Sequence, residues 1–168
     1  MIPDFLPYRT KAVLFWFPMI RLTKQADYGI LLMTQFARAG HHGIFSATDL
    51  ATKSGLSLPM VNKTLKLLGK AGLLASTRGV NGGYQMSRDA GAITLEEVIA
   101  AVDGPIALTE CHEHGGAEEC GISSHCPTRL NWGIINDALR DSLSGITLVQ
   151  MIRPMLSSRP VASRATTT

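Results

Sequence analysis

The chain has 168 residues, of which 45% are hydrophobic and 17% are charged, and its formal net charge is +3. This composition excludes a disordered chain, and this length holds one small domain with an accessory element rather than two full domains. Residues 12–20 lack a signal-peptide cleavage site and no stretch reaches the roughly 18 to 20 apolar residues that span a bilayer, so we expect a cytoplasmic protein with no membrane partner.

The sequence pattern predicts a mainly α fold with one small β-hairpin, divided into five segments. These are a poorly ordered N-terminal extension at 1–18, a winged helix-turn-helix domain at 19–104, a cysteine-rich loop at 105–127, a dimerisation helix with a short terminal helix at 128–155, and a disordered tail at 156–168. The tail is mostly Ser, Thr, Arg and Ala without an apolar stripe.

Two helices are predicted at the start of the patterned region. Apolar residues at helical spacing indicate a first helix over 23–38 that stops before Gly40. Ser46 and Asp49 form a sequence close to a capping box, in which each side chain bonds the backbone of the other residue. They open a short second helix that ends at Gly55.

The Ser57 side chain is expected to cap a third helix, which has Pro59 in its first turn and ends at Gly72. Two short helices separated by a tight turn form a helix-turn-helix pattern, and the second of them enters the major groove of DNA. Asn62 has the side chain that reads an adenine edge, whereas Met60 suits either a thymine methyl group or a core position. The contacts expected from this helix are Ser57, Pro59, Met60, Asn62, Lys63 and Lys66.

A β-hairpin is predicted next, because residues 73–79 and 84–87 are strand-like and the glycine-rich stretch 80–83 between them favours a turn. Such a hairpin after a helix-turn-helix is a wing. An arginine near its tip can enter a narrow minor groove, and glycines let the backbone approach the DNA closely. An ordinary exposed hairpin is the alternative. The contacts expected from the wing are Arg78, Asn81, Gly82, Gly83 and Tyr84.

The distribution of charge supports this interpretation. Residues 21–89 carry nine Lys or Arg and three Asp or Glu, a net charge of +6, whereas residues 91–153 carry three basic and nine acidic side chains, a net charge of −6. A basic half is a candidate surface for a polyanion, although a merely solvated basic face is common. Together with the helix pair and the wing, it favours DNA binding.

Three further helix signals follow the hairpin. Thr94 and Glu97 form a second capping box, and the helix that they open is closed by Gly104. Apolar residues at helical spacing predict a long helix after Pro127, and Thr147 caps a short final one. A long helix placed after a complete small domain has little left in its own chain to pack on. We therefore expect it to pair with its copy in a homodimer.

All three cysteines, Cys111, Cys120 and Cys126, lie in the loop before the long helix. A structural zinc site takes two ligands from a knuckle of about two to four residues, which this loop lacks. Wider spacing suits an iron-sulfur cluster, of the [2Fe-2S] or the [4Fe-4S] type, because its iron atoms lie apart and bind thiolates. The amino end of the following helix also attracts an anionic cluster. The fourth ligand stays open, with His125 among the candidate loop histidines.

The cysteines have two other interpretations. Zinc binding or direct oxidation of the thiols would also make a regulator that responds through this loop. A cluster-assembly or redox enzyme is the weaker alternative, because the chain has no C-x-x-C pair and no Ser-His-Asp-like or glycine-rich phosphate motif. We therefore expect that the chain is not an enzyme.

The sequence RLTKQADY at 21–28, the sequence RGVNGGY at 78–84 and three cysteines before a long helix occur together in this chain. Over about residues 19–154 the combination resembles the IscR and NsrR family of winged-helix iron-sulfur regulators, and most closely the regulators of SUF-system iron-sulfur assembly. The resemblance implies a homodimer that binds double-stranded promoter DNA and carries a cluster on the three cysteines. It further implies repression or activation of operon promoters, and we expect repression of a SUF-type iron-sulfur assembly operon in response to iron, oxygen or nitric oxide.

The resemblance also bears on the fourth ligand. In nitric-oxide-sensing members an acidic residue at the place of Asp27 reaches the cluster of the partner subunit, which makes Asp27 a candidate ligand. IscR-type members instead place a histidine three residues after the last cysteine, where this chain has Arg129. The first gap between cysteines is also longer here than in those members. The resemblance therefore leaves the cluster type and the fourth ligand open.

Overall fold

The computed structural model describes residues 22–40, 43–79, 82–109, 112 and 125–153, so the predicted extension at 1–18 and tail at 156–168 lie outside the described residues. The elements are α1 (Lys24–Ala39), α2 (Ala47–Ser54), α3 (Leu58–Lys70), β1 (Leu74–Thr77), β2 (Gly83–Met86), the 3-10 turn η1 (Ala90–Ala92), α4 (Leu95–Asp103), α6 (Arg129–Ser144) and α7 (Leu148–Ile152). The predicted fold class, mainly α with one hairpin, is confirmed. Among these residues no helix combines the length and the apolar composition that crossing a bilayer requires.

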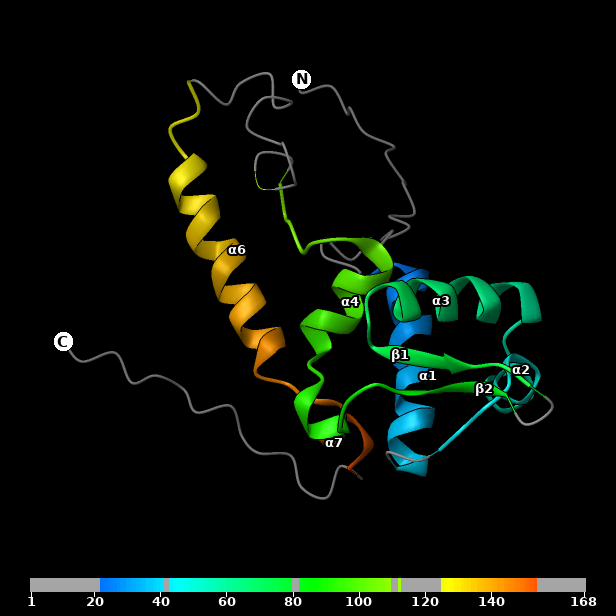
Figure 1. Cartoon of the computed structure of the whole chain (residues 1–168). Coiled ribbons are helices and arrows are strands. Elements are labelled where there is room, and N and C mark those ends of the chain that lie inside the picture. The colour runs from blue at the N-terminus through cyan, green and yellow to red at the C-terminus, as the bar shows by residue number, and fades with distance from the viewer. Residues whose placement is uncertain (1–21, 41–42, 80–81, 110–111, 113–124, 154–168) are drawn as a thin grey trace, which may run out of the picture.

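The core lies around α1, which packs against α3, α4 and α7. Leu32 and Phe36 project from one face of α1 and are fully buried, as are Leu65 of α3, Val98 of α4 and Leu148 of α7. Burying one such side chain stabilises the fold by about 1.5–3 kcal/mol. Figure 1 shows the result, a body built from α1 to α4 and the hairpin, with α6 standing to one side and α7 returning the chain to the body.

The helix ends confirm the two capping boxes that the sequence predicted. The Asp49 amide donates to Ser46 Oγ at 3.1 Å, and the Ser46 amide donates to Asp49 Oδ2 at 3.2 Å. The Ser46 hydroxyl and then its amide hold the pKa of the Asp49 carboxyl below its usual value. At α4 the Glu97 amide donates to Thr94 Oγ1 at 3.2 Å, and the Thr94 amide donates to Glu97 Oε2 at 2.9 Å. Each box satisfies amides at a helix start that have no partner inside the helix.

The hairpin differs from its prediction at both strands. The first strand is shorter than residues 73–79, and Gly83 belongs to the second strand rather than to the turn, because it pairs with Thr77. The hairpin also has a neighbour that the sequence pattern did not indicate. The Phe45 amide donates to the Tyr84 carbonyl at 3.0 Å, and the Tyr84 amide donates to the Phe45 carbonyl at 2.9 Å. A Cβ added at Gly83 would lie 2.7 Å from the Phe45 carbonyl oxygen, so this pairing requires glycine at position 83.

The first half of helix α6 leaves its apolar side chains exposed, whereas Leu143 near its end packs against the core. Leu130 is 83% exposed, Ile134 is 70% exposed and Ile135 is 47% exposed. The one buried side chain in this helix is polar, Asn136, at 5% exposure. The predicted amphipathic helix is therefore present, but among the described residues nothing covers the part of its apolar face formed by Leu130, Ile134 and Ile135.

Removing one core side chain of α3 tests this packing. Leu65 is fully buried and Leu58, on the same helix, is 42% exposed. We expect Leu65→Ala to lower the free energy of unfolding by about 2–5 kcal/mol, because the substitution leaves a cavity, and Leu58→Ala to lower it by less than about 1 kcal/mol. Urea unfolding followed by circular dichroism at one fixed protein concentration measures both. Equal losses in the two variants would contradict the assigned orientation of α3.

Candidate DNA-binding surface and cysteine segment

The start of α3 and the tip of the hairpin lie at the same end of the molecule (Figure 1). Ser57 occupies the residue before α3, but its hydroxyl makes no capping hydrogen bond, which corrects the prediction that this side chain caps the helix. Pro59 explains the difference in part, since a proline in the first turn lacks one of the two amides that a cap would bind. Ser57 and Pro59 are both exposed, and they lie where a helix-turn-helix meets DNA.

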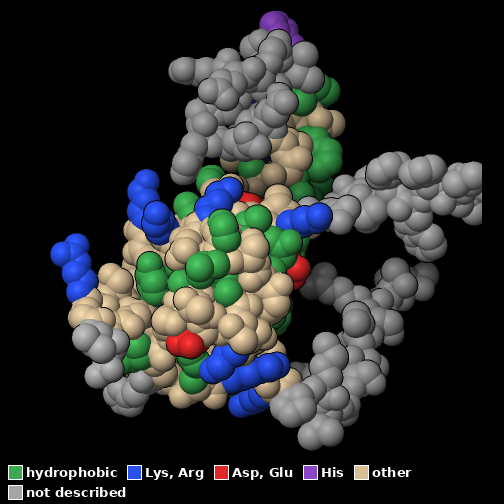
Figure 2. All heavy atoms as spheres, turned by 90° about the vertical axis from the view of Figure 1, so that its right-hand side faces the viewer, with side chains coloured by type: hydrophobic (Ala, Val, Ile, Leu, Met, Phe, Trp, Pro, Cys, Tyr) green, Lys and Arg blue, Asp and Glu red, His purple; other side chains and the backbone are tan. Residues whose placement is uncertain are grey.

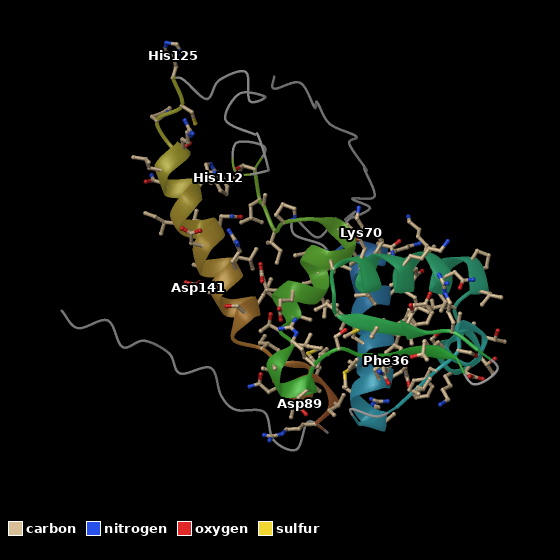
Figure 3. The ribbon with its side chains drawn as sticks, in the orientation of Figure 1. Phe36, Lys70, Asp89, His112, His125 and Asp141 are labelled. Carbon is tan, nitrogen blue, oxygen red and sulfur yellow. The ribbon has the colours of Figure 1, made fainter. Side chains whose placement is uncertain are left out.

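Helix α3 presents a basic face away from the core. Its buried side chains are Val61, Thr64, Leu65 and Leu68. Lys63 and Lys66 are exposed, and Lys70 points away from the body at the far end of the helix (Figure 3). Asn62 and Met60 are half-buried at the edges of this face. A half-buried Met60 is compatible both with contact to a thymine methyl group and with a core position. The helical spacing therefore separates the core side chains from the predicted DNA contacts.

The wing carries Arg78 at its outer end. Arg78 is exposed directly after β1, whereas Gly82, Gly83 and Tyr84 are half-buried, and the predicted contact Asn81 lies outside the described residues. The turn closes through a hydrogen bond of 2.9 Å from the Gly82 amide to the Gly79 carbonyl. A side chain at Gly82 would overlap the Thr77 carbonyl oxygen, which explains a glycine at this position.

Phe45 fixes the hairpin relative to the helices, and sequence reasoning missed it. Its backbone pairs with Tyr84, and its ring lies edge-on to Phe36 with 5.4 Å between ring centroids. The Lys53 ammonium lies 4.1 Å from the centroid of the same ring, which is a cation-π contact. A lone aromatic residue between two helices gives no periodic signal. Its role depends on contacts that are distant in sequence.

Figure 2 faces the end of the molecule where the hairpin tip and the start of α3 lie. Basic side chains are spread around this face, acidic side chains are few, and hydrophobic side chains lie between them. A basic surface of this kind attracts the phosphate backbone of nucleic acid. The charge division seen in the sequence is therefore also a division in space, because the acidic Glu96, Asp137 and Asp141 line an open cleft between α4 and α6.

Among the three cysteines only Cys126 lies within the described residues, at the amino end of α6. Its sulfur lies 3.4 Å from the Thr128 hydroxyl oxygen. The Thr128 hydroxyl, then the Thr128 amide, and to a smaller extent Arg129 hold the pKa of the Cys126 thiol below its usual value. A thiolate is the form that binds metal, so the chemistry of this position suits an iron or zinc ligand.

The candidate fourth ligands lie apart. His125 is exposed just before the amino end of α6 and points away from the body (Figure 3). Asp27 is exposed in the first turn of α1, and the starts of α1 and α6 are well separated in Figure 1. No group of three or more His, Cys, Asp or Glu side chains comes together among the residues that the structure describes, which leave out Cys111 and Cys120. Asp27 and Cys126 of one subunit therefore do not share a site.

Comparison with known proteins gives related sequences and structures. The sequence profile of Rrf2, described as an iron-dependent transcriptional regulator, matches residues 22–154. The HTH-type transcriptional regulator IscR of Cronobacter sakazakii is 35% identical over 133 residues, which are 79% of this chain and 80% of that protein. Two solved structures are similar. CymR, the global cysteine regulator of B. subtilis, has a TM-score of 0.62 and 27% identity over 79% of this chain and 96% of that one. IscR of T. potens has a TM-score of 0.60 and 25% identity over 79% of this chain and 86% of that one.

The lowered pKa of Cys126 predicts how the cluster-free protein reacts with an alkylating reagent. Because the Thr128 hydroxyl favours the thiolate, Thr128→Val should raise the pKa of Cys126 and move its alkylation profile to higher pH. Mass spectrometry of the Cys126 peptide after timed iodoacetamide treatment at several pH values measures this shift. Thr52→Val, on α2, is the control. An unchanged profile in Thr128→Val would contradict the contact between the two side chains.

Proposed function

The chain belongs to the Rrf2 family of transcriptional regulators, and on that premise we propose that it binds promoter DNA as a homodimer and reports the state of an iron-sulfur cluster. Its relatives are DNA-binding regulators similar to IscR, so it is a transcriptional regulator and not an enzyme. The observation that carries the proposal is the match to a family described as iron-dependent over residues 22–154, the span that contains all three cysteines. A cytoplasmic location, where promoter DNA lies, is part of the proposal.

In the proposed DNA complex, α3 reads the bases, and lysines and the wing position the protein on the DNA backbone and in the minor groove. Asn62 reads a base edge at the start of α3, while Lys63 and Lys66 bind phosphates on either side of the groove. Arg78 enters the adjacent minor groove from the wing. The remaining proposed contacts are Ser57, Pro59, Met60, Asn81, Gly82, Gly83 and Tyr84. Support comes from the exposed basic face of α3 and from the exposure of Arg78.

The sensing half assigns Cys111, Cys120 and Cys126 as ligands of a [2Fe-2S] or [4Fe-4S] cluster. The position of Cys126 supports this, since its thiolate is favoured by neighbours at the amino end of α6 and a helix start also favours an anionic cluster. A bound cluster supplies chemistry that responds to iron supply, oxygen or nitric oxide. The fourth ligand is proposed to be Asp27 of the partner subunit, with His125 as the alternative. The separation of α1 and α6 within one subunit agrees with a ligand contributed across the dimer.

The dimer connects the two halves. The exposed face of α6 formed by Leu130, Ile134 and Ile135 is the surface that a second copy would cover. Because Cys126 directly precedes the same helix, ordering of the cysteine loop by a cluster would act on the start of the dimer helix. This ordering would set the spacing of the two α3 helices on the promoter. We propose that the promoter belongs to a SUF-type iron-sulfur assembly operon and that the protein represses it.

A second candidate function is a regulator that responds through zinc or through oxidation of its thiols. The similarity to CymR, which is called a global cysteine regulator, favours this alternative. The two functions differ in the metal and in the colour of the protein, because zinc has no visible absorption.

Visible absorption of protein purified without air decides between these functions. We expect a coloured protein with iron and sulfide in similar amounts, and a colourless Cys120→Ala variant, because two remaining thiolates hold a cluster poorly. Ser76→Ala, an exposed change in the hairpin, serves as the control and should keep the colour. Stoichiometric zinc in a colourless wild-type protein would contradict the iron-sulfur proposal and support the alternative.

Salt-dependent binding to a promoter fragment tests the DNA contacts. Arg78→Ala should weaken binding by about 1–3 kcal/mol, and Lys66→Ala should reduce the salt slope by about one unit, because each removes a phosphate or groove contact. Arg88→Ala is the control, because Arg88 pairs with Glu97 at 2.8 Å. Fluorescence anisotropy over a salt series gives both quantities. Unchanged affinity in Arg78→Ala would exclude the wing from the interface.

A further inference from the structure

The most buried side chain of helix α6 is polar, whereas an ordinary amphipathic helix buries apolar side chains. Asn136 is 5% exposed, although apolar side chains of the same helix are solvent-exposed. The Leu108 amide donates to Asn136 Oδ1 at 3.2 Å, across 28 positions of sequence. This bond attaches the chain that leaves α4 to the side of α6. A buried carboxamide that accepts from a distant backbone amide holds a segment in place rather than filling a core.

Gly133 lies one helical turn before Asn136, on the same face of α6. A Cβ added at Gly133 would lie 3.2 Å from His112 Nε2 and 3.9 Å from His112 Cδ2. The missing side chain therefore leaves the space in which the imidazole of His112 sits. Figure 3 shows His112 beside α6, in contrast to His125, which points away. A helix with glycine in its interior is less stable than one with alanine there. At position 133 the close approach of His112 offsets this loss of helix stability.

Thr109 and His112, which lie next to these two contacts, are also bonded to each other. The His112 amide donates to the Thr109 carbonyl at 3.0 Å, and the Thr109 hydroxyl lies 3.1 Å from His112 Nδ1. Leu108, Thr109 and His112 thus dock as one unit on the Gly133 and Asn136 face. We call this unit and that face the α6 clamp.

We propose that Gly133 and Asn136 are positioning residues that hold the first cysteine of the cluster site close to the helix that begins after the last one. Cys111 is bonded to His112, and consecutive Cα atoms are about 3.8 Å apart, so fixing His112 limits the positions that the Cys111 thiolate can take. Cys126 lies just before the same helix. The α6 clamp therefore brings both ends of the cysteine segment to one rigid element, which reduces the entropy lost when a cluster binds. The inference rests on the proposed iron-sulfur function.

The test uses the full-length protein, reconstituted with iron and sulfide without air, and a graded series at position 133. Gly133→Ala and Gly133→Leu both favour the helix but push increasingly against His112, and Asn136→Leu removes the acceptor for Leu108. Ser142→Ala is the matched control, since it raises helix propensity in the same helix, where Ser142 Oγ bonds only the carbonyl of Ala138 among the described residues. Loss of visible absorbance in excess chelator gives the rate of cluster release, and visible circular dichroism reports the geometry of the ligands.

We expect cluster release to be about tenfold faster in Gly133→Leu and Asn136→Leu, with Gly133→Ala between them and wild type, as for other residues that orient metal ligands. The circular dichroism of the bound cluster should change in these variants and not in Ser142→Ala. Thermal unfolding of the cluster-free Gly133→Ala protein should be unchanged or shifted upward, which a purely structural loss would not produce. Wild-type release rates and spectra throughout the series would overturn the proposal. A wild-type protein that takes up no iron or sulfide would instead overturn the proposed function.

Discussion

The arrangement of the described residues depends on one feature of α6, which packs Leu143 near its end against the core but leaves the apolar side chains of its first half exposed. Leu130 and Ile134 are mostly exposed, while the side that faces the subunit holds Asn136 and the ion pair of Arg140 with Glu96 at 3.9 Å. An exposed apolar face of this kind marks an interaction site. The same helix begins three residues after Cys126, so this cysteine lies next to the element that carries the exposed face.

Contacts inside the subunit link α6 to the DNA-binding elements. Helix α6 packs on α4, α4 packs on α1 and α3, and α7 returns the chain to α1. At the start of α1 the Gln25 side chain donates to Thr64 Oγ1 at 2.7 Å, and Thr64 is fully buried in α3. The hairpin is held to the same framework by Phe45. Packed elements therefore connect α6 to α3 without a break.

The parts of the fold that sequence reasoning predicted are those set by local chemistry. The capping boxes at Ser46 and Thr94 depend on residues three positions apart, and the buried stripe of α3 depends on helical spacing alone. The parts that it missed depend on partners far along the chain. Phe45 pairs with Tyr84, and Asn136 accepts from Leu108, and neither residue stands out in a periodic pattern.

The cysteine site shows the same limit. Spacing indicated the ligand type, and the position of Cys126 at the start of α6 agrees with a thiolate ligand. The candidate role of Asp27 came from family resemblance alone, because a ligand that crosses between subunits leaves no periodic signal in one sequence. Within one subunit the structure keeps α1 and the start of α6 apart, so any site that includes both needs the dimer.

Promoter affinity as a function of cluster occupancy tests most directly whether the cluster controls DNA binding. The protein with and without its cluster would be titrated without air against the same promoter fragment at the same salt concentration. We predict that the two forms differ in affinity by about fivefold or more, as expected when a ligand couples to a distant site. Equal affinities of the two forms, in a protein that does hold a cluster, would show that the cluster does not control DNA binding.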